Sequence, residues 1–145
     1  NRKLVMPFFG QEQLIASEET DGLDNFHYKQ ALETSRHLTR DVGIDKAMFD
    51  HDLCALVMPT SSAPWSIDLI NGDNRLGGSS CQAAVSGYPS ITVPMGYLNG
   101  LPVGMSFVGK PWNDFFITGL ASAFEQNFGV RVDPGKASPF LVGSK

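Results

Sequence analysis

The chain has 145 residues, with 11 Lys and Arg against 15 Asp and Glu, and a formal net charge of −4 at pH 7. This length suits one domain with a single hydrophobic core, and the acidic balance disfavours a nucleic acid or an anionic membrane surface as a partner. The hydrophobic share of 42% excludes a disordered chain, and the longest apolar run, 53–59, is too short to cross a bilayer. The composition is that of a soluble globular protein.

Two helices are predicted near the start of the chain. A short one falls within 6–15, where Pro7 suits the first helical turn. A longer one follows Asp24 and Asn25, which are candidate caps, and should end at Gly43. The repeating face of this longer helix consists of Tyr28, Leu32, Ser35, Leu38 and Val42.

A third helix and a strand follow. Lys29 and Glu33 are predicted to pair along the long helix, and Asp45 is predicted to cap a short helix that runs through His51. The segment 53–58 is apolar on both faces and stops before Pro59. This pattern predicts an interior strand of an α/β sheet.

Residues 60–80 form a long segment without periodicity, rich in small polar side chains. An irregular loop of this length in a compact domain is usually functional or disordered. The embedded Trp65, Ile67, Leu69 and Ile70 favour an ordered loop. A short helix is predicted to follow at 80–86.

A hairpin is predicted over 90–97 and 102–109, because Asn99-Gly100 between two alternating segments is a strong local turn signal. Pro94 cannot donate a ladder hydrogen bond, so it should lie at a bulge or an unpaired edge. In the second strand Val103, Met105 and Phe107 are predicted to share one face. Gly104, Ser106 and Gly109 are predicted to leave the other face nearly flat.

A last helix is predicted from Asp114, as its cap, to the residue before Gly129. Its apolar face is predicted to consist of Phe116, Leu120, Ala123, Phe124 and Asn127 with Phe128. The tail from Asp133 onward is predicted to be surface coil.

The sequence carries no catalytic motif that is complete in itself. It has no Gly-x-Ser-x-Gly elbow, phosphate loop, dinucleotide-binding motif or His-Glu-x-x-His metal helix. Cys54 and Cys81 are interpreted as buried free thiols, and His27, His37 and His51 as solvated histidines. Neither a metal nor a cofactor is predicted.

The best candidate for a binding site is the polar loop, where Asp68, Asn71 and Asp73 alternate with Trp65 and Leu69. Apolar walls with a few directional polar groups are typical of small-molecule pockets. The alternative is a surface loop whose polar steps are merely turns.

The run Gly77-Gly78-Ser79-Ser80 comes directly before the predicted short helix. Small residues at a helix start can present backbone N–H groups to an anion or oxyanion. Capping or pocket lining is favoured over a nucleophilic role for Ser79 or Ser80, since no Lys or His lies nearby in the sequence.

The segments 84–96 and 100–109 resemble the C-terminal part of amidase-signature hydrolases. The segments 6–12 and 53–60 fit the same region. Residues 63–73, together with Gly77-Gly78-Ser79-Ser80, look most like the bacterial peptide-amidase branch. The similarity covers nearly the whole chain and keeps several motifs in order.

The resemblance implies an α/β fold, namely the C-terminal portion of the amidase-signature fold, with a mixed sheet, an Asn-Gly hairpin and covering helices. It implies a parent enzyme that hydrolyses a small-molecule or peptide amide with a serine nucleophile, a bridging serine and a lysine, and releases ammonia. Those residues precede the matched region, so no catalytic residue is assigned here. Trp65, Asp68, Asn71, Asp73 and Ser79 are the candidates for one wall of the substrate cleft.

We therefore expect residues 1–145 to be a C-terminal fragment of a single amidase domain, since Asn1 is not an initiator Met and no signal-peptide pattern follows it. Such a fragment should be inactive alone and should self-associate through its exposed seam. Two other functions stay open. One is the component of an amidotransferase that releases ammonia from glutamine for a transfer-RNA-linked substrate, and the other is a non-catalytic binding or scaffold module.

Overall fold

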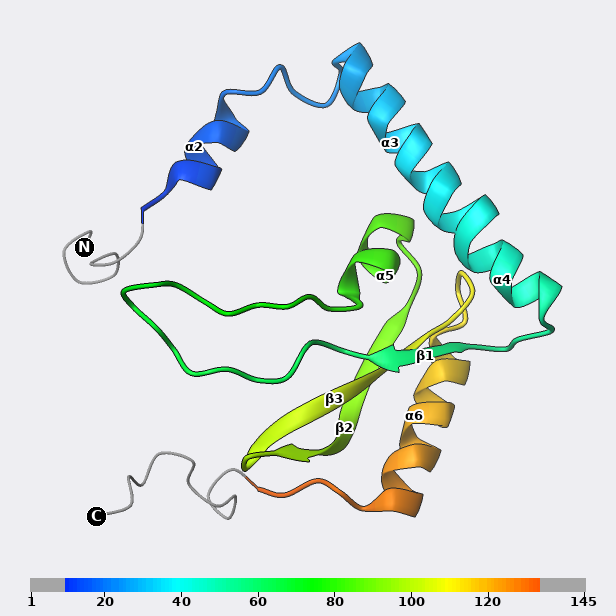
Figure 1. Cartoon of the computed structure of the whole chain (residues 1–145). Helices are drawn as coiled ribbons and strands as arrows, with labels where there is room; N and C mark the ends of the chain where they lie inside the picture. Colours follow the sequence, from blue (N-terminus) through cyan, green and yellow to red (C-terminus); the bar gives the residue numbers. More distant parts are fainter. Residues whose placement is uncertain (1–9, 134–145) are drawn as a thin grey trace.

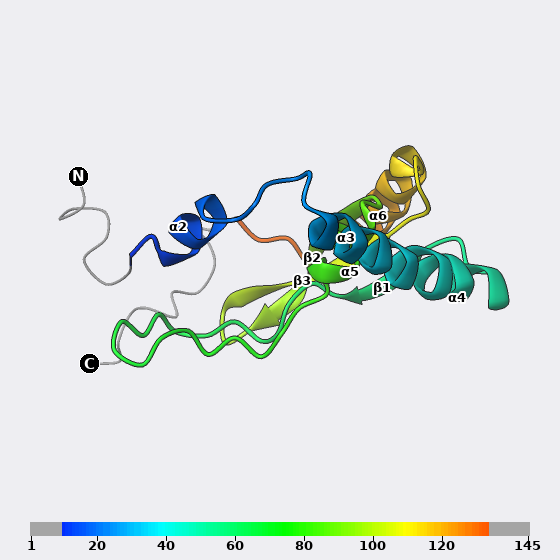
Figure 2. The ribbon, with the colours of Figure 1, turned by 90° about the horizontal axis from the view of Figure 1, so that it is seen from above.

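The computed structural model describes residues 10–133, in which helices cover both faces of a small sheet (Figure 1). The helices are α2 (Glu12–Glu18), α3 (Phe26–Thr39), α4 (Asp45–Asp50), α5 (Ser80–Ser86) and α6 (Asp114–Phe128), with a π-helical turn, η1 (Arg40–Ile44), between α3 and α4. The strands are β1 (Leu56–Pro59), β2 (Ser90–Leu98) and β3 (Leu101–Val108). Helix α2 lies apart from the sheet in both views (Figures 1 and 2). The part of its predicted segment at 6–9, and the predicted coil beyond Asp133, lie outside the described residues.

The sheet has the order β1-β3-β2, and both pairs are antiparallel. The α/β class is confirmed, although these three strands contain no parallel pair of the predicted mixed sheet. Strand β1 pairs with β3 alone, and Val57 is 53% exposed. The prediction of an interior strand is therefore wrong for the part of the chain that the structure describes.

The hairpin between β2 and β3 is confirmed. Asn99 and Gly100 both have positive φ, at 51° and 79°, as a tight two-residue turn requires. The bulge predicted near Pro94 is also present. Pro94 pairs with Gly104 and Gly96 pairs with Val103, so one extra residue of β2 lies between them.

The two faces of β3 contact different helices. Phe107 packs with Val93 against Ile117 and Ala121 of α6. On the other face, Val108 packs with Ala83 of α5, Tyr88 between α5 and β2, Ile44 of η1 and Met48 of α4. Alternating side chains of one central strand thus join two small cores.

Some predicted details of these faces were wrong. A Cβ on Gly109 would lie 2.7 Å from Ile117 Cγ2, so Gly109 faces α6 instead of lying on the flat face. The buried residues of α6 are Ile117 and Ala121, with Leu120 and Phe124 packed beside them. Phe116 is 40% exposed. The N-cap of α6 is Asn113 and makes no side-chain cap hydrogen bond, whereas Asp114 lies in the first turn.

The long N-terminal helix does not end at Gly43, as the sequence predicted. It passes through η1 directly into α4, where Asp45 is the first residue of the helix and not its N-cap as predicted. A Cβ on Gly43 would lie 2.6 Å from the carbonyl oxygen of Leu38, five residues earlier. The missing side chain therefore permits the wider π turn.

The predicted cap of α3 is confirmed, because the Asn25 side chain accepts hydrogen bonds from the backbone N–H groups of His27 and Tyr28. Lys29 pairs with Asp24, at 2.9 Å, instead of Glu33. No residue of α3 is buried, and Leu38 of the predicted apolar face is 57% exposed. Packing within the described residues leaves most of this face uncovered.

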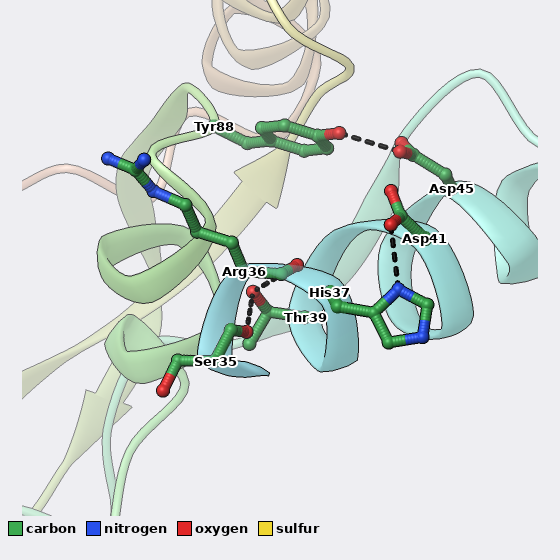
Figure 3. A network of polar contacts seen from close by, with 7 residues as sticks. All are labelled: Ser35, Arg36, His37, Thr39, Asp41, Asp45 and Tyr88. Carbon is green, nitrogen blue, oxygen red and sulfur yellow. Dashed lines mark hydrogen bonds and ion pairs between the residues drawn. The ribbon is translucent and has the colours of Figure 1, made fainter. Parts of the chain in front are cut away.

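Tyr88 links the helical segment to the sheet. Its hydroxyl donates a 2.7 Å hydrogen bond to Asp45 Oδ2 (Figure 3). The Arg40 guanidinium lies 5.6 Å from the centre of the Tyr88 ring, and its Nε donates to the Ser86 carbonyl at 2.6 Å. Burial, together with the hydrogen bond to Asp45, raises the pKa of Tyr88 to about 12.

We predict that Tyr88→Phe lowers the free energy of unfolding by about 1 kcal/mol, since it leaves Asp45 without this donor. The raised pKa means that the contribution of the hydroxyl is complete below pH 10 and is lost as the pH rises through about 12. The wild-type chain should therefore lose more stability than the variant over that range. Denaturant titrations at several pH values measure this difference. Tyr28→Phe, at a residue that is 42% exposed, is the matched control, and equal pH profiles for wild type and Tyr88→Phe would contradict the assignment.

Candidate functional site

A groove of about 530 Å³ opens where the end of β1 and the following residues meet the β2–β3 hairpin. Its lining residues are all uncharged: Thr60, Ser61, Ser62, Pro64, Trp65, Thr92, Val93, Pro94, Pro102, Val103 and Gly104. Proline and tryptophan side chains contribute apolar surface to the wall, whereas the Val93 side chain packs in the core against α6. The groove thus has the mixture of apolar surface and a few hydroxyl groups that is typical of small-molecule sites.

The floor of the groove is the flat face predicted for β3. Gly104 has no side chain there, and a Cβ at this position would lie 2.8 Å from both Thr60 Oγ1 and Thr92 Cγ2. The prediction for Gly104 and Ser106 is therefore confirmed. Along this face of β3, Val108 is covered by the core, Ser106 is buried and Gly104 borders open space.

Three hydroxyl groups, from β2, β3 and the residue after β1, meet beside this floor. Ser106 Oγ lies 2.8 Å from Thr60 Oγ1 and 2.9 Å from Thr92 Oγ1, and Thr60 Oγ1 lies 3.4 Å from Thr92 Oγ1. Ser106 is only 4% exposed, whereas both threonines line the groove. Sequence reasoning did not assign the threonines to a site. The strand register would have indicated them, because Thr92 is directly opposite Ser106.

The loop between β1 and α5 is closed at its base by main-chain hydrogen bonds. Ser62 N donates to Gly77 O at 3.0 Å, Ser79 N donates to Thr60 O at 3.1 Å, and Ser61 and Gly78 form an isolated bridge. Beyond this base the loop extends away from the sheet as two strand-like arms (Figures 1 and 2). We call this hydrogen-bonded base, residues 60–62 and 77–79, the neck of the loop. Main-chain hydrogen bonds hold it closed.

Ser79 lies at this neck instead of in the groove. It is 8% exposed and occupies the N-cap position of α5, but its hydroxyl donates to the Thr60 carbonyl at 3.3 Å and caps no N–H group. No serine hydroxyl in residues 10–133 hydrogen-bonds a lysine or a histidine. The described part of the chain therefore contains no activated serine nucleophile.

The remaining predicted site residues form two separate pairs in the loop. Trp65 lines the groove, and its Nε1 donates to Asp73 Oδ1 at 3.1 Å. Asp68 Oδ1 accepts hydrogen bonds from the N–H groups of Ile70 and Asn71, both at 2.9 Å, and Oδ2 accepts one from Asn71 Nδ2 at 2.8 Å. The bonds from Asn71, followed by the one from Ile70, hold the pKa of Asp68 below its ordinary value.

The loop tip does not provide the apolar wall that the sequence indicated. Ile67 is 83% exposed, Leu69 59% and Ile70 93%. Asp68 and Asn71 form a local turn, and of the five predicted site residues, all within the described part of the chain, Trp65 lines the groove. The groove's other side comes from the hairpin.

The predicted environments of the cysteines and histidines had different outcomes. Both Cys54 and Cys81 are exposed, so their interpretation as buried thiols is wrong. His27, His37 and His51 are exposed as expected, and His37 Nδ1 lies 2.8 Å from Asp41 Oδ2 (Figure 3).

Over residues 10–133, no cluster of three or more His, Cys, Asp or Glu could hold a metal ion. No helix in this range is long and apolar enough to span a bilayer.

We predict that Ser106→Ala lowers the free energy of unfolding by about 1–2 kcal/mol, because both threonine hydroxyls lose a partner beside the buried floor. Denaturant unfolding measures the loss. Ser17→Ala is the matched control. The Ser17 hydroxyl is exposed and bonds only the Gln13 carbonyl, and its removal should cost less than about 0.5 kcal/mol. Equal losses in the two variants would contradict a stabilising role for the hydroxyl cluster.

No protein-family model matches the chain, but individual proteins do. It is 32% identical over 136 residues to a Schizosaccharomyces pombe protein named as an amidase, covering 90% of this chain and 22% of that protein. It is 33% identical over 105 residues to a glutamyl-tRNA(Gln) amidotransferase subunit from Symbiobacterium thermophilum, covering 69% of this chain and 21% of that protein.

Solved structures give the same picture. The native peptide amidase from Stenotrophomonas maltophilia is 40% identical, with a TM-score of 0.79 and coverage of 91% of this chain and 26% of the enzyme. A structure of the peptide amidase PAM with the competitive inhibitor chymostatin is 42% identical, with a TM-score of 0.83, and covers 91% of this chain and 27% of that one. The chain spans about a fifth to a quarter of the length of the proteins it matches.

Proposed function

Because this chain belongs to the amidase-signature family, we propose that it is the C-terminal portion of an amidase that hydrolyses a linear carboxamide C–N bond and releases ammonia. C-terminal peptide amides are the substrates favoured by the similarity to peptide amidase. The observation that carries the proposal is the uncharged groove with Trp65 at its edge, in a chain 40–42% identical to peptide amidases.

In this proposal the chain supplies one wall of the substrate cleft and no catalytic group. Trp65 lies at the groove and is held by Asp73, while Asp68 and Asn71 shape the loop beyond them. Ser79 fixes the neck of the loop by its bonds to Thr60. The nucleophilic serine, bridging serine and lysine that the family resemblance implies belong to other parts of the enzyme. Residues 1–145 are then one portion of a single amidase domain.

We predict that the isolated chain releases no ammonia from peptide amides or simple carboxamides, whereas the longest natural polypeptide containing it does. Removal of the serine nucleophile of a serine hydrolase lowers turnover roughly a millionfold, so residual activity should be undetectable. A coupled ammonia assay on both proteins is the measurement. If the isolated chain hydrolyses an amide and a serine-directed reagent inhibits it, the catalytic residues do not lie outside this chain and the proposed roles are wrong. If the longer polypeptide is inactive on every amide, the proposed activity is wrong.

A second function has support from one observation, the 33% identity to a protein of the amidotransferase type. In that case the substrate amide would be glutamine and activity would depend on partner subunits. The ammonia assay distinguishes the two functions. Activity of the purified longer polypeptide on peptide amides without added proteins favours the amidase, and glutamine hydrolysis that requires co-purified subunits favours the amidotransferase.

Exposed apolar side chains lead us to propose that the isolated chain self-associates. Phe26 is 71% exposed, Phe49 86% and Phe115 94%, and β1 has a free edge among the described strands. Apolar surface of this kind and an unpaired strand edge both promote association. We expect sedimentation velocity to show species larger than a monomer at tens of micromolar chain. A monomer at this and at tenfold higher concentration would contradict the prediction.

A further inference from the structure

We infer that the groove between the hairpin and the base of the loop takes an uncharged, apolar side chain of the amide substrate, with Trp65 as one wall and Asp73 as the residue that positions Trp65. This inference rests on the proposed amidase function and deepens it. It concerns the selectivity of the site and leaves the location of the reacting atoms open.

First, the groove has no charged lining residue. None of its lining residues is ionisable, and Pro64, Pro94 and Pro102 present apolar surface. A carboxylate or an ammonium group entering this space would lose hydration and gain no opposite charge, which is strongly unfavourable. An aromatic or aliphatic side chain has no charge to desolvate and removes its own apolar surface from water.

The hydroxyl cluster carries the second step. Ser106 is buried and its hydrogen bonds go to Thr60 and Thr92. The two threonines, in contrast, line the groove, and each hydroxyl can still accept a hydrogen bond from a ligand. The floor therefore offers neutral hydrogen-bonding groups, suited to a peptide N–H beside an apolar side chain.

The bond between Trp65 and Asp73 carries the third step. Trp65 is the aromatic residue of the lining, and it belongs to the loop instead of the sheet. The 3.1 Å bond from its Nε1 to Asp73 Oδ1 is the hydrogen bond that fixes the indole orientation. Asp73 is outside the lining, so it acts on a ligand through Trp65. It is a positioning residue.

The test uses the longest natural polypeptide containing this chain, immobilised for steady-state surface plasmon resonance under continuous flow, which replaces any hydrolysed ligand. The probes are N-acetyl amides of phenylalanine, leucine, glycine and aspartic acid. We expect the phenylalanine and leucine amides to bind at least about tenfold more tightly than the aspartic acid amide, a usual range for apolar discrimination. Trp65→Ala should reduce this ratio to below about threefold and leave glycine amide binding unchanged.

Matched variants separate the groove from general effects. Trp112→Ala removes the other tryptophan, which is 96% exposed and outside this groove, and should preserve the ratio. Asp73→Leu should lower the ratio because Nε1 loses its acceptor, and Asp73→Asn, which retains an oxygen there, should restore it. Thr92→Val should weaken binding of all four amides alike, whereas Thr118→Val on α6 should not.

The outcomes distinguish the two proposals. Equal binding of the phenylalanine and aspartic acid amides to the wild-type protein, or a ratio that survives both Trp65→Ala and Asp73→Leu, would overturn the inference whether or not the amides are hydrolysed. The expected ratios without release of ammonia from any amide would support the apolar groove and overturn the proposed amidase activity. Circular dichroism of each variant identifies those that fail to fold, and the Asp73 pair then decides the result.

Discussion

The register of the β2–β3 hairpin is the constraint on which the described structure depends. The turn at Asn99-Gly100 fixes one end of this register, and the bulge after Pro94 adjusts it. A shift of one residue would exchange the two faces of a strand. Phe107 would then leave the core beneath α6, and Ser106 would leave Thr60 and Thr92. Packing of α6, burial of the hydroxyl cluster and the open floor at Gly104 thus share one cause.

The difference between the faces of β3 explains why a groove exists at this place. Large side chains on one face of β3 are covered by α6. On the other face, Val108 is packed in the core and Gly104 lines the groove, with Ser106 between them. Glycine at this position lets the Thr60 and Thr92 side chains approach β3 closely, since a Cβ would meet Thr60 Oγ1 and Thr92 Cγ2 at 2.8 Å. The groove therefore lies where the cover on this face of β3 ends, next to a loop that contributes one aromatic wall.

The sequence predicted those features that local chemistry decides. The Asn-Gly turn, the Pro94 bulge, the Asn25 cap and the left-handed Gly129 after α6 each depend on one or two residues. It did not predict the π turn, because Gly43 is as suitable for ending a helix as for allowing the close approach of the Leu38 carbonyl. Nor did it predict that Thr60 and Thr92 line the groove beside Trp65, because the two threonines are brought together by the pairing of β1 and β2 with β3. Asp68 and Asn71 were predicted as residues of the cleft wall, and the structure shows them hydrogen-bonded to each other in the loop.

The neck of the long loop has a consequence for how this protein can diversify. Its closing bonds at Thr60, Ser62, Gly77 and Ser79 run through main-chain atoms, which every amino acid except proline can supply on the donor side. Substitutions, and even changes of length, between 63 and 76 can therefore accumulate while the strands stay in place. The side chains of the loop that carries Trp65 can therefore change during evolution while the strands keep their structure.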